Sequence, residues 1–563
     1  MVRQLGISGI LLCVLPWTAT SSLISLHSQS RTTPTTTRTG VECTKVGGFF
    51  SAVVRLCICE PCHVCEFKKN SLTCGYKEHK ELDASDGSDL TVDQPLLAPT
   101  DWFLTKEEIT ASRNGSTRGD MATYTTGNDV TTYTVTKEFF DAAFTDLSST
   151  KEGDRVMLTG WGTDLIPFQP DVDGGNQSQL LDVNIKTRDD INDIPASVTT
   201  GKKPLFVFDD RVPTITSTHH QIEGSGSTPY RWDTIYHNES ELRESTGVSG
   251  SFKGWIDGHV RIHGPAAKDV AGNFLSRWNS DYEPTQGLAK DLLEFDNPPY
   301  DDLAPLDYTS SRTKSELGSQ NVQIVRTFSC KYEHYDEFAP YGENSLFQAR
   351  IKALLSAKNF IYIEDQYFIL VPELLEAILQ VMPTIQRLIV VVQRPVGRSK
   401  FSGYEKYMFE MTAPIQKLYP NKFQIYTTKE ELDLYIHSKV VIIDDVYLSV
   451  GSANWNRRSM TSDSELAANI IDDETVESPD GIAVLKAARD FRIRKFQEMT
   501  GRSYEELDAM PFIEAANQFD VVAADNSSII ETYEVKRQTY FTAVTDAVRK
   551  KVDPQDTCTE PEK

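Results

Sequence analysis

Short apolar runs that alternate with helical patterns constrain the fold of this chain more than any other feature of its sequence. Runs with the length and composition of buried strands occur at 360–366, 388–392, 423–426 and 439–443. Segments with apolar residues at helical spacing lie before and between them, at 346–355, 373–381 and 404–418. Strands that are apolar along their whole length need cover on both faces. The sequence therefore predicts an α/β protein.

A helix–strand opening of the same kind occurs about 200 residues earlier, with helical spacing at 137–147 and an apolar strand at 155–161. This repetition predicts a duplicated body with two similar halves. The composition along the chain gives the expected divisions: 1–22 signal peptide, 23–42 Ser/Thr-rich linker, 43–76 cysteine-rich module, 77–130 polar connector, 131–310 first half, 311–515 second half and 516–563 C-terminal tail.

The N-terminus has the pattern of a secretory signal peptide. Arg3 precedes an apolar run at 5–14, and small polar residues follow at 18–22, so we expect cleavage near residues 20–25. The apolar run is about half as long as the ~20 residues that a membrane span needs. We therefore expect a secreted, extracellular protein without a transmembrane span.

Most of the cysteines lie close together after this segment, at Cys43, Cys57, Cys59, Cys62, Cys65 and Cys74. In a secreted chain such a cluster favours three disulfides, whose pairing the spacing leaves open. Cysteines at 59, 62 and 65 with His63 would also suit zinc, but a secretory route argues against a metal. Glycosylation sequons agree with that route and occur at Asn114, Asn176, Asn238 and Asn526.

The charge balance limits the partners that the surface can attract. The chain carries 57 Lys and Arg against 81 Asp and Glu, which gives a formal net charge of −24. A surface this acidic repels nucleic acid and anionic lipid unless basic side chains gather in one cleft. We therefore expect no nucleic-acid partner.

The second half contains a histidine and a lysine at the start of an apolar strand. His437 and Lys439 are two residues apart, so on a strand they project from the same face. An imidazole can attack phosphorus or protonate a leaving alcohol, and an ammonium group can hold a phosphate oxygen. Ser452 and Asn454, which follow Asp444, can add hydrogen bonds. The pattern predicts a phosphodiester site in which lysine supplies the positive charge, so we expect neither a metal nor a cofactor.

The spacing His-x-Lys-x4-Asp-x6-Gly-Ser-x-Asn resembles the phospholipase D superfamily. Other blocks are also similar to segments of that family, at Tyr362–Phe368, Trp255–Ala267, Phe274–Asn279 and Gly451–Met460. The resemblance extends over roughly 135–512 and is strongest to secreted phospholipase D-like proteins of oomycetes. It implies two halves, each with a mixed sheet flanked by helices, that meet at a pseudo-twofold axis and contribute one histidine motif each.

The resemblance also implies roles for residues of the second motif. It gives His437 the acid–base role in a catalytic motif that Lys439 and Asp444 complete. The supporting residues would be Ser452 and Asn454 for the phosphate and Glu465 for the imidazole.

The first motif departs from the family pattern. His220 resembles its histidine and would be the nucleophile, and Asp233 would be an orienting residue. However, Ile222 stands where the lysine belongs and Ser227 where the aspartate belongs. Either this is a genuine variant with one damaged half-site, or internal segments are missing from the chain as given. Deleting apolar strands from a core would cost more than a normal margin of stability, which favours the second explanation.

The first functional hypothesis is a phospholipase D, a phosphoric diester hydrolase that converts phosphatidylcholine-type lipids to phosphatidic acid and a free head-group alcohol. The resemblance implies a phosphohistidine intermediate. We expect a monomer that meets its phospholipid substrate peripherally at a membrane surface. One alternative is a nuclease or other phosphodiesterase that uses the same chemistry. The other is a catalytically silent secreted effector that keeps the fold.

Overall fold

The structure is a computed structural model that describes residues 63–68, 71–76, 85–119, 121–148, 232–245, 254–279, 304, 318–330, 339–395 and 403–537. The chain divides into two compact units. The described part of the smaller unit is an antiparallel hairpin of β1 (His63–Lys68) and β2 (Ser71–Tyr76), in which Cys65 lies directly opposite Cys74. The predicted signal peptide, the linker and the strand at 155–161 lie outside the described residues.

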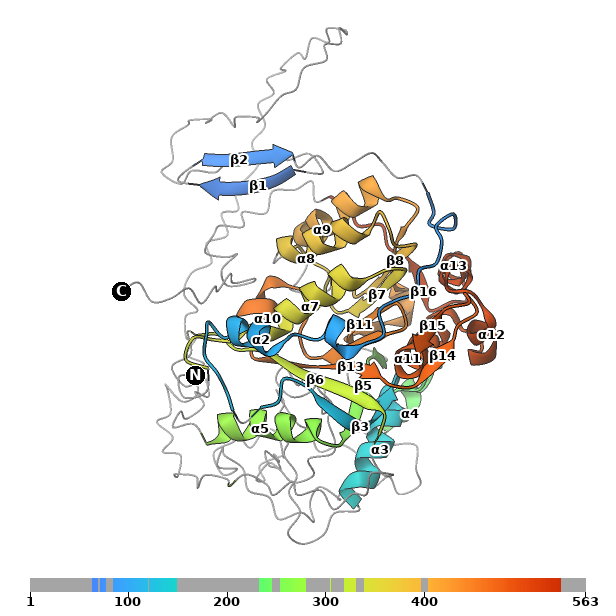
Figure 1. Cartoon of the computed structure of the whole chain (residues 1–563). Helices are drawn as coiled ribbons and strands as arrows, with labels where there is room; N and C mark the ends of the chain where they lie inside the picture. The colour runs from blue at the N-terminus through green and yellow to red at the C-terminus, as the bar shows by residue number, and fades with distance from the viewer. Residues whose placement is uncertain are drawn as a thin grey trace, which may run out of the picture. The chain divides into compact units, whose positions relative to one another are not determined.

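The larger unit is built on a ten-stranded mixed sheet (Figure 1). In spatial order its strands are β16 (Ile530–Thr532), β9 (Phe423–Thr428), β8 (Arg387–Val392), β7 (Phe360–Asp365), β11 (Lys439–Ile443), β12 (Tyr447–Gly451), β13 (Glu465–Asp472), β6 (Gln320–Thr327), β3 (Thr125–Tyr133) and β5 (His259–His263). β7, β8 and β9 run parallel to one another, and the other neighbouring pairs are antiparallel. Two short pairs lie outside this sheet: parallel β4 (Gly254–Ile256) with β10 (Leu434–Ile436), and antiparallel β14 (Thr475–Glu477) with β15 (Ala483–Leu485).

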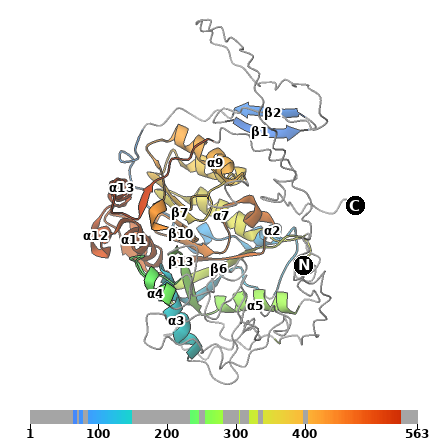
Figure 2. The ribbon, with the colours of Figure 1, turned by 180° about the vertical axis from the view of Figure 1, so that it is seen from behind.

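Helices flank this sheet (Figures 1 and 2). They are α1 (Pro99–Trp102), α2 (Lys106–Ser112), α3 (Thr136–Ser148), α4 (Ser240–Ser245), α5 (Ala266–Trp278), α7 (Ser345–Ser356), α8 (Pro372–Val381), α9 (Tyr404–Leu418), α10 (Arg457–Thr461), α11 (Lys486–Thr500), α12 (Tyr504–Ala509) and α13 (Phe512–Ala523), with a short 3₁₀ helix at Glu430–Leu432. None of the helices in the described part of the chain is both long and apolar enough to cross a bilayer.

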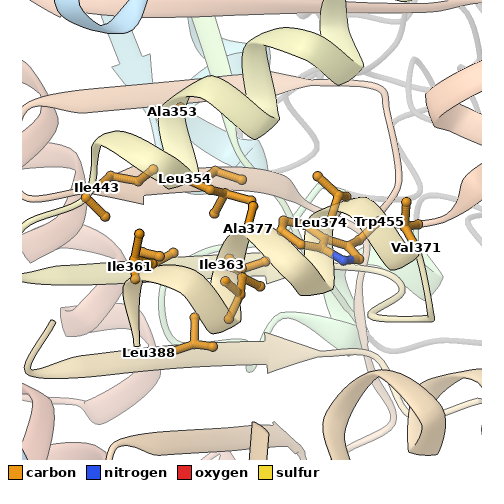
Figure 3. Close-up of a cluster of buried hydrophobic side chains, with 14 of the residues drawn as sticks. Ala353, Leu354, Ile361, Ile363, Val371, Leu374, Ala377, Leu388, Ile443 and Trp455 are labelled. Atoms are coloured by element: carbon orange, nitrogen blue, oxygen red, sulfur yellow. The ribbon is translucent and has the colours of Figure 1, made fainter. Parts of the chain in front are cut away.

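The central strands are buried on both faces. In β7, Ile361 and Ile363 pack into one hydrophobic cluster with α7, α8 and α9, whereas Phe360 and Tyr362 pack into another with α11 and α13. Figure 3 shows the first cluster, in which α7 and α8 lie over the apolar side chains of β7, β8 and β11. This arrangement confirms the predicted α/β class with a mixed sheet flanked by helices. It also explains why β8 and β11 are apolar after their first residues, Arg387 and Lys439.

The predicted helices and strands of the second half occur within one or two residues of the expected bounds. The helix expected at 137–147 is α3. The duplication remains a prediction, since the described part of the first half supplies only β4, β5, part of β3 and helices α3 to α5.

Two segments differ from the predicted divisions. The polar connector expected at 77–130 supplies core side chains: Trp102 is fully buried and stacks on Tyr447, with ring centroids 5.6 Å apart. The C-terminal tail expected from 516 contains most of α13 and the edge strand β16, whose Ile530 is also fully buried. In both segments buried side chains such as Trp102 and Phe519 stand among polar neighbours, so the average polarity of each segment concealed its part in the core.

Removal of the Trp102 side chain tests the contribution of this segment to the core. We expect Trp102→Ala to lower the free energy of unfolding by about 3–5 kcal/mol, because it deletes a large buried aromatic group. Urea unfolding measures the change. Leu355→Ala, at a side chain that is 42% exposed, is the control and should change stability far less. Equal stability of the Trp102 variant and the wild type would contradict a core role for this segment.

Candidate active site

The sheet topology brings several residues of the second motif together at one end of its central strands. Lys439 begins β11 directly beside Asp365, which ends β7. Ser452 follows the end of β12, and Glu465 begins β13. Because these neighbouring strands are antiparallel, the start of one lies beside the end of the next. His437 and Asn454 flank the same strand ends in sequence.

The pairing of β10 with β4 determines the surroundings of His437. The His437 backbone N–H donates to the Ile256 carbonyl at 2.9 Å. The next residue, Asp257, is fully buried and places Oδ2 3.7 Å from His437 Nδ1. The Trp255 ring lies against the imidazole, with centroids 4.7 Å apart. A carboxylate at Nδ1 fixes the tautomer that leaves Nε2 to exchange protons with a substrate.

Asp257 is a functional residue that the sequence analysis did not single out. The resemblance gave the role of orienting the imidazole to Glu465, whereas the structure brings Asp257 to His437. The signal was present in the sequence, because Asp257 lies inside the similar block at Trp255–Ala267.

The Lys439 side chain contacts the backbone of His437. Its Nζ donates to the His437 carbonyl at 2.5 Å and lies 3.5 Å from Gln366 Oε1. Gln366 in turn donates to the Tyr435 hydroxyl at 2.5 Å. Only 4% of His437 and 1% of Lys439 is exposed. The ammonium group is thus held against the backbone of His437 in a site with little exposure to water, where charge acts strongly.

Ser452 and Glu465 join β12 to β13. The Ser452 hydroxyl donates to Glu465 Oε2 at 2.5 Å and accepts from the Leu466 backbone N–H at 3.0 Å. Gly451 allows this close approach, since a Cβ there would lie 2.5 Å from Ala467 Cβ. Gly451 therefore serves packing of β12 against β13. Asn454, which is 3% exposed, follows in the same loop.

Asp444 lies at the other end of β11, away from His437. Its carboxylate accepts three backbone N–H groups at the start of β7, from Lys358 at 2.6 Å, Asn359 at 2.8 Å and Phe360 at 2.7 Å. Burial raises the pKa of Asp444 to about 7, against the effect of these three hydrogen bonds. Five residues of strand separate Asp444 from Lys439 by roughly 16 Å. The structure therefore gives Asp444 an anchoring role in place of the catalytic one.

The described residues include only part of the first motif. His220 lies outside the described residues. Asp233 is buried, and its Oδ2 lies 2.8 Å from His237 Nδ1. The Lys137 backbone N–H donates to the Asp233 carbonyl at 3.0 Å. Within the described ranges, no group of three or more His, Cys, Asp or Glu side chains could hold a metal ion.

The fold and the site define a mixed α/β protein with a buried histidine–lysine site at one edge of its sheet. Two family models match the chain: one described as phospholipase D at residues 219–376, and one described as cardiolipin synthase, PLD-like domain, at 351–480. The chain belongs to the phospholipase D superfamily.

Curated relatives include phospholipase D alpha 1 of Carica papaya, which is 25% identical over 54% of this chain and 48% of its own length. Phospholipase D gamma 2 of Arabidopsis thaliana is 25% identical over 44% of this chain and 39% of its own length. The chain thus spans about half of these relatives or less.

Solved structures with similarity include Nuc of Salmonella typhimurium, a phospholipase D family member, at 19% identity and a TM-score of 0.20, over 27% of this chain and 84% of that one. Phosphatidylserine synthase of Haemophilus influenzae matches at 14% identity and a TM-score of 0.23, over 37% of this chain and 46% of that one.

The Asp444 anchor gives a stability prediction. Asp444→Ala leaves three N–H groups at the start of β7 without their acceptor, two of them buried, so we expect the free energy of unfolding to fall by about 3–5 kcal/mol. Urea unfolding measures this change. Glu431→Ala removes a carboxylate from an exposed position and should leave stability within about 0.5 kcal/mol of the wild type. An Asp444 variant as stable as the Glu431 control would refute the anchoring role.

The contact between Asp257 and His437 gives a prediction on catalysis. Asp257→Asn keeps the size of the side chain and removes its charge, so we expect kcat for phosphodiester hydrolysis to fall about 100-fold or more. The imidazolium also loses its counter-ion, and because His437 must be protonated to act as the proton donor, the basic limb of the pH–kcat profile should move to lower pH. Steady-state kinetics across pH measure both effects. Asp146→Asn, which breaks an ion pair with Arg261, is the matched control. A kcat equal to that of this control would exclude Asp257 as the partner of His437.

Proposed function

We propose that the protein is a phosphodiesterase that hydrolyses the head-group ester of phosphatidylcholine-type phospholipids. The observation that carries the proposal is the buried His437 imidazole, with Asp257 Oδ2 3.7 Å from Nδ1, together with the buried Lys439 ammonium group that donates to the His437 carbonyl. This arrangement supplies a proton-transfer group and a fixed cation for a phosphate. Superfamily membership and the names of the plant relatives support the lipid substrate.

The proposed reaction proceeds in two steps. His220 attacks phosphorus and forms a phosphohistidine, while His437 donates its proton to the departing head-group oxygen. His437 then takes a proton from water, whose oxygen attacks phosphorus and releases phosphatidic acid and His220. Lys439 and Asn454 bind the non-bridging oxygens during both steps.

Secretion is part of the proposal. The N-terminal sequence has the pattern of a signal peptide. Cysteine chemistry supports an oxidising compartment, since Cys330 is disulfide-bonded. Cys65 and Cys74 are directly opposed in β1 and β2, and opposed residues lie within the Cα separation that a disulfide needs. Asn238 and Asn526 are exposed and could carry glycans.

A catalytically silent secreted effector is the second candidate. The observation that favours it is Ile222, which stands where the first motif needs a lysine. Without that cation, the phosphate would have one charged contact fewer, and loss of a preorganised donor costs several kcal/mol of barrier.

Choline release from phosphatidylcholine vesicles tests the proposal. We expect the secreted protein to release choline and His437→Ala to reduce the rate by about 1,000-fold or more, because the proton donor is lost. His263→Ala, at the end of β5, is the histidine control and should keep the wild-type rate. Release that survives His437→Ala would contradict the site.

The same preparations separate the alternatives. Cleavage of an oligonucleotide without lipid turnover would support a nuclease instead. No turnover of either substrate by a folded sample would support the silent effector.

A further inference from the structure

A buried lysine on α11 contacts residues that surround the candidate site. Lys495 is fully buried, and its ammonium group meets two carboxylates, Glu364 Oε1 at 2.7 Å and Glu498 Oε2 at 2.5 Å. It also contacts two backbone carbonyls, those of Asp257 at 3.3 Å and Thr134 at 3.4 Å. These four oxygen atoms come from β7, from α11 itself, from the segment after β4 and from the segment after β3.

Glu364 connects Lys495 to the segment that carries His437 and Lys439. The hydroxyl of Ser438, the residue between His437 and Lys439, donates to Glu364 Oε1, the same oxygen that Lys495 contacts. Ser438 and Glu364 are both fully buried. The other oxygen of Glu364 accepts from the Tyr362 hydroxyl at 2.7 Å. Glu364 is therefore held at both oxygens, and it fixes the backbone from which His437 and Lys439 project.

The first carbonyl connects Lys495 to the partner of His437. Asp257 accepts from Lys495 through its backbone oxygen and faces His437 through its carboxylate. One ammonium group therefore contacts the residue that orients the imidazole and, through Glu364 and Ser438, the chain that carries the imidazole.

The remaining groups around Lys495 keep it charged. Burial lowers the pKa of Lys495, but the carboxylates of Glu364 and Glu498 outweigh that effect, and the net direction is upward. On the far side of Glu498, His237 Nε2 lies 3.5 Å from Oε1, and His237 Nδ1 lies 2.8 Å from Asp233 Oδ2. Burial raises the pKa of Glu498 to about 7, although Lys495 and His237 oppose the rise.

We propose that Lys495 is a positioning residue for the reaction, which sets the alignment of His437 against Asp257 through the Ser438–Glu364 contact and the Asp257 carbonyl. This inference rests on the proposed function of the same site. A purely structural ion pair is the competing explanation, and buried ion pairs can often be replaced by apolar side chains without loss of stability. The two explanations differ in what they predict for kcat once the folded fraction is equal.

Substitutions at the two ends of this connection test the proposal. We expect Ser438→Ala to lower kcat by about 10- to 100-fold and to leave KM within about twofold, because misalignment by a fraction of an ångström affects the transition state more than binding. Lys495→Met should lower kcat at least as much, and Lys495→Arg should restore part of the loss. Lys486→Met, at an exposed lysine of the same helix, is the matched control.

The double variant Ser438→Ala with Lys495→Met shows whether the two residues affect kcat through the same contacts or independently. Since both residues act through the same alignment, kcat of the double variant should lie within about threefold of the worse single variant, instead of at the product of the two losses. Fully multiplicative losses, or a kcat for Ser438→Ala and Lys495→Arg equal to that of the Lys486 control, would overturn the proposal. If Lys495→Met does not fold, the kcat values of Ser438→Ala and Lys495→Arg still decide the test.

A titration that needs no turnover distinguishes failure of this inference from failure of the proposed function. In protein labelled with ¹⁵N-histidine, His437 is assigned by comparison with His437→Ala. Ser438→Ala changes no charge, so loss of the alignment with Asp257 in this variant should lower the pKa of His437, whereas Lys486→Met should leave it unchanged. An unchanged pKa in Ser438→Ala would overturn the positioning role. Absence of phosphodiester turnover by the wild type, with the expected pKa change intact, would instead remove the proposed function alone.

Discussion

The burial of β11 on both faces is the constraint on which the rest of the site depends. Val441 and Ile443 fill one hydrophobic cluster, and Val440 and Ile442 fill the other. In β11 the polar side chains lie at the ends, because a polar group in its middle would be buried and would need a partner there. The histidine and lysine are therefore confined to one end and Asp444 to the other. The spacing between Lys439 and Asp444 thus reflects the length of a buried strand as well as the chemistry of the site.

Much of this arrangement could be predicted from the sequence, because it depends on local periodicity. Runs such as Leu388–Val392 identify strands, and the spacing of His437 and Lys439 places them on one face. The role of Asp257 could not be derived in that way. Its place beside His437 comes from the parallel pairing of β4 with β10, two strands about 180 residues apart in the chain. Trp102 escaped prediction for a related reason, since one large side chain in a polar segment leaves no periodic signal.

Buried charge is the second feature that local patterns do not reveal. Glu364 is buried in β7, and it is stable there because Lys495, Ser438 and Tyr362 meet its oxygens. The same principle operates at Glu343, which lies between Arg326 and Arg113. Burial alone would raise the pKa of Glu343, but the two guanidinium groups hold it at about 2. In both places a carboxylate from one segment satisfies cations from others, and a mismatch would be costly. These clusters therefore tie distant segments together.

In the proposed reaction, the incomplete first motif affects phosphate binding more than it affects proton transfer by His437. Asp257 belongs to the first half of the chain, yet it serves the histidine of the second half. It lies outside the segment in which Ile222 and Ser227 depart from the family pattern. The proton-transfer pair of His437 and Asp257 is thus independent of that departure, as is the Lys439 cation. What the departure removes is the second cation that would hold the phosphate near His220. Any impairment therefore falls on phosphate binding and on attack at phosphorus, while protonation of the leaving group keeps its machinery.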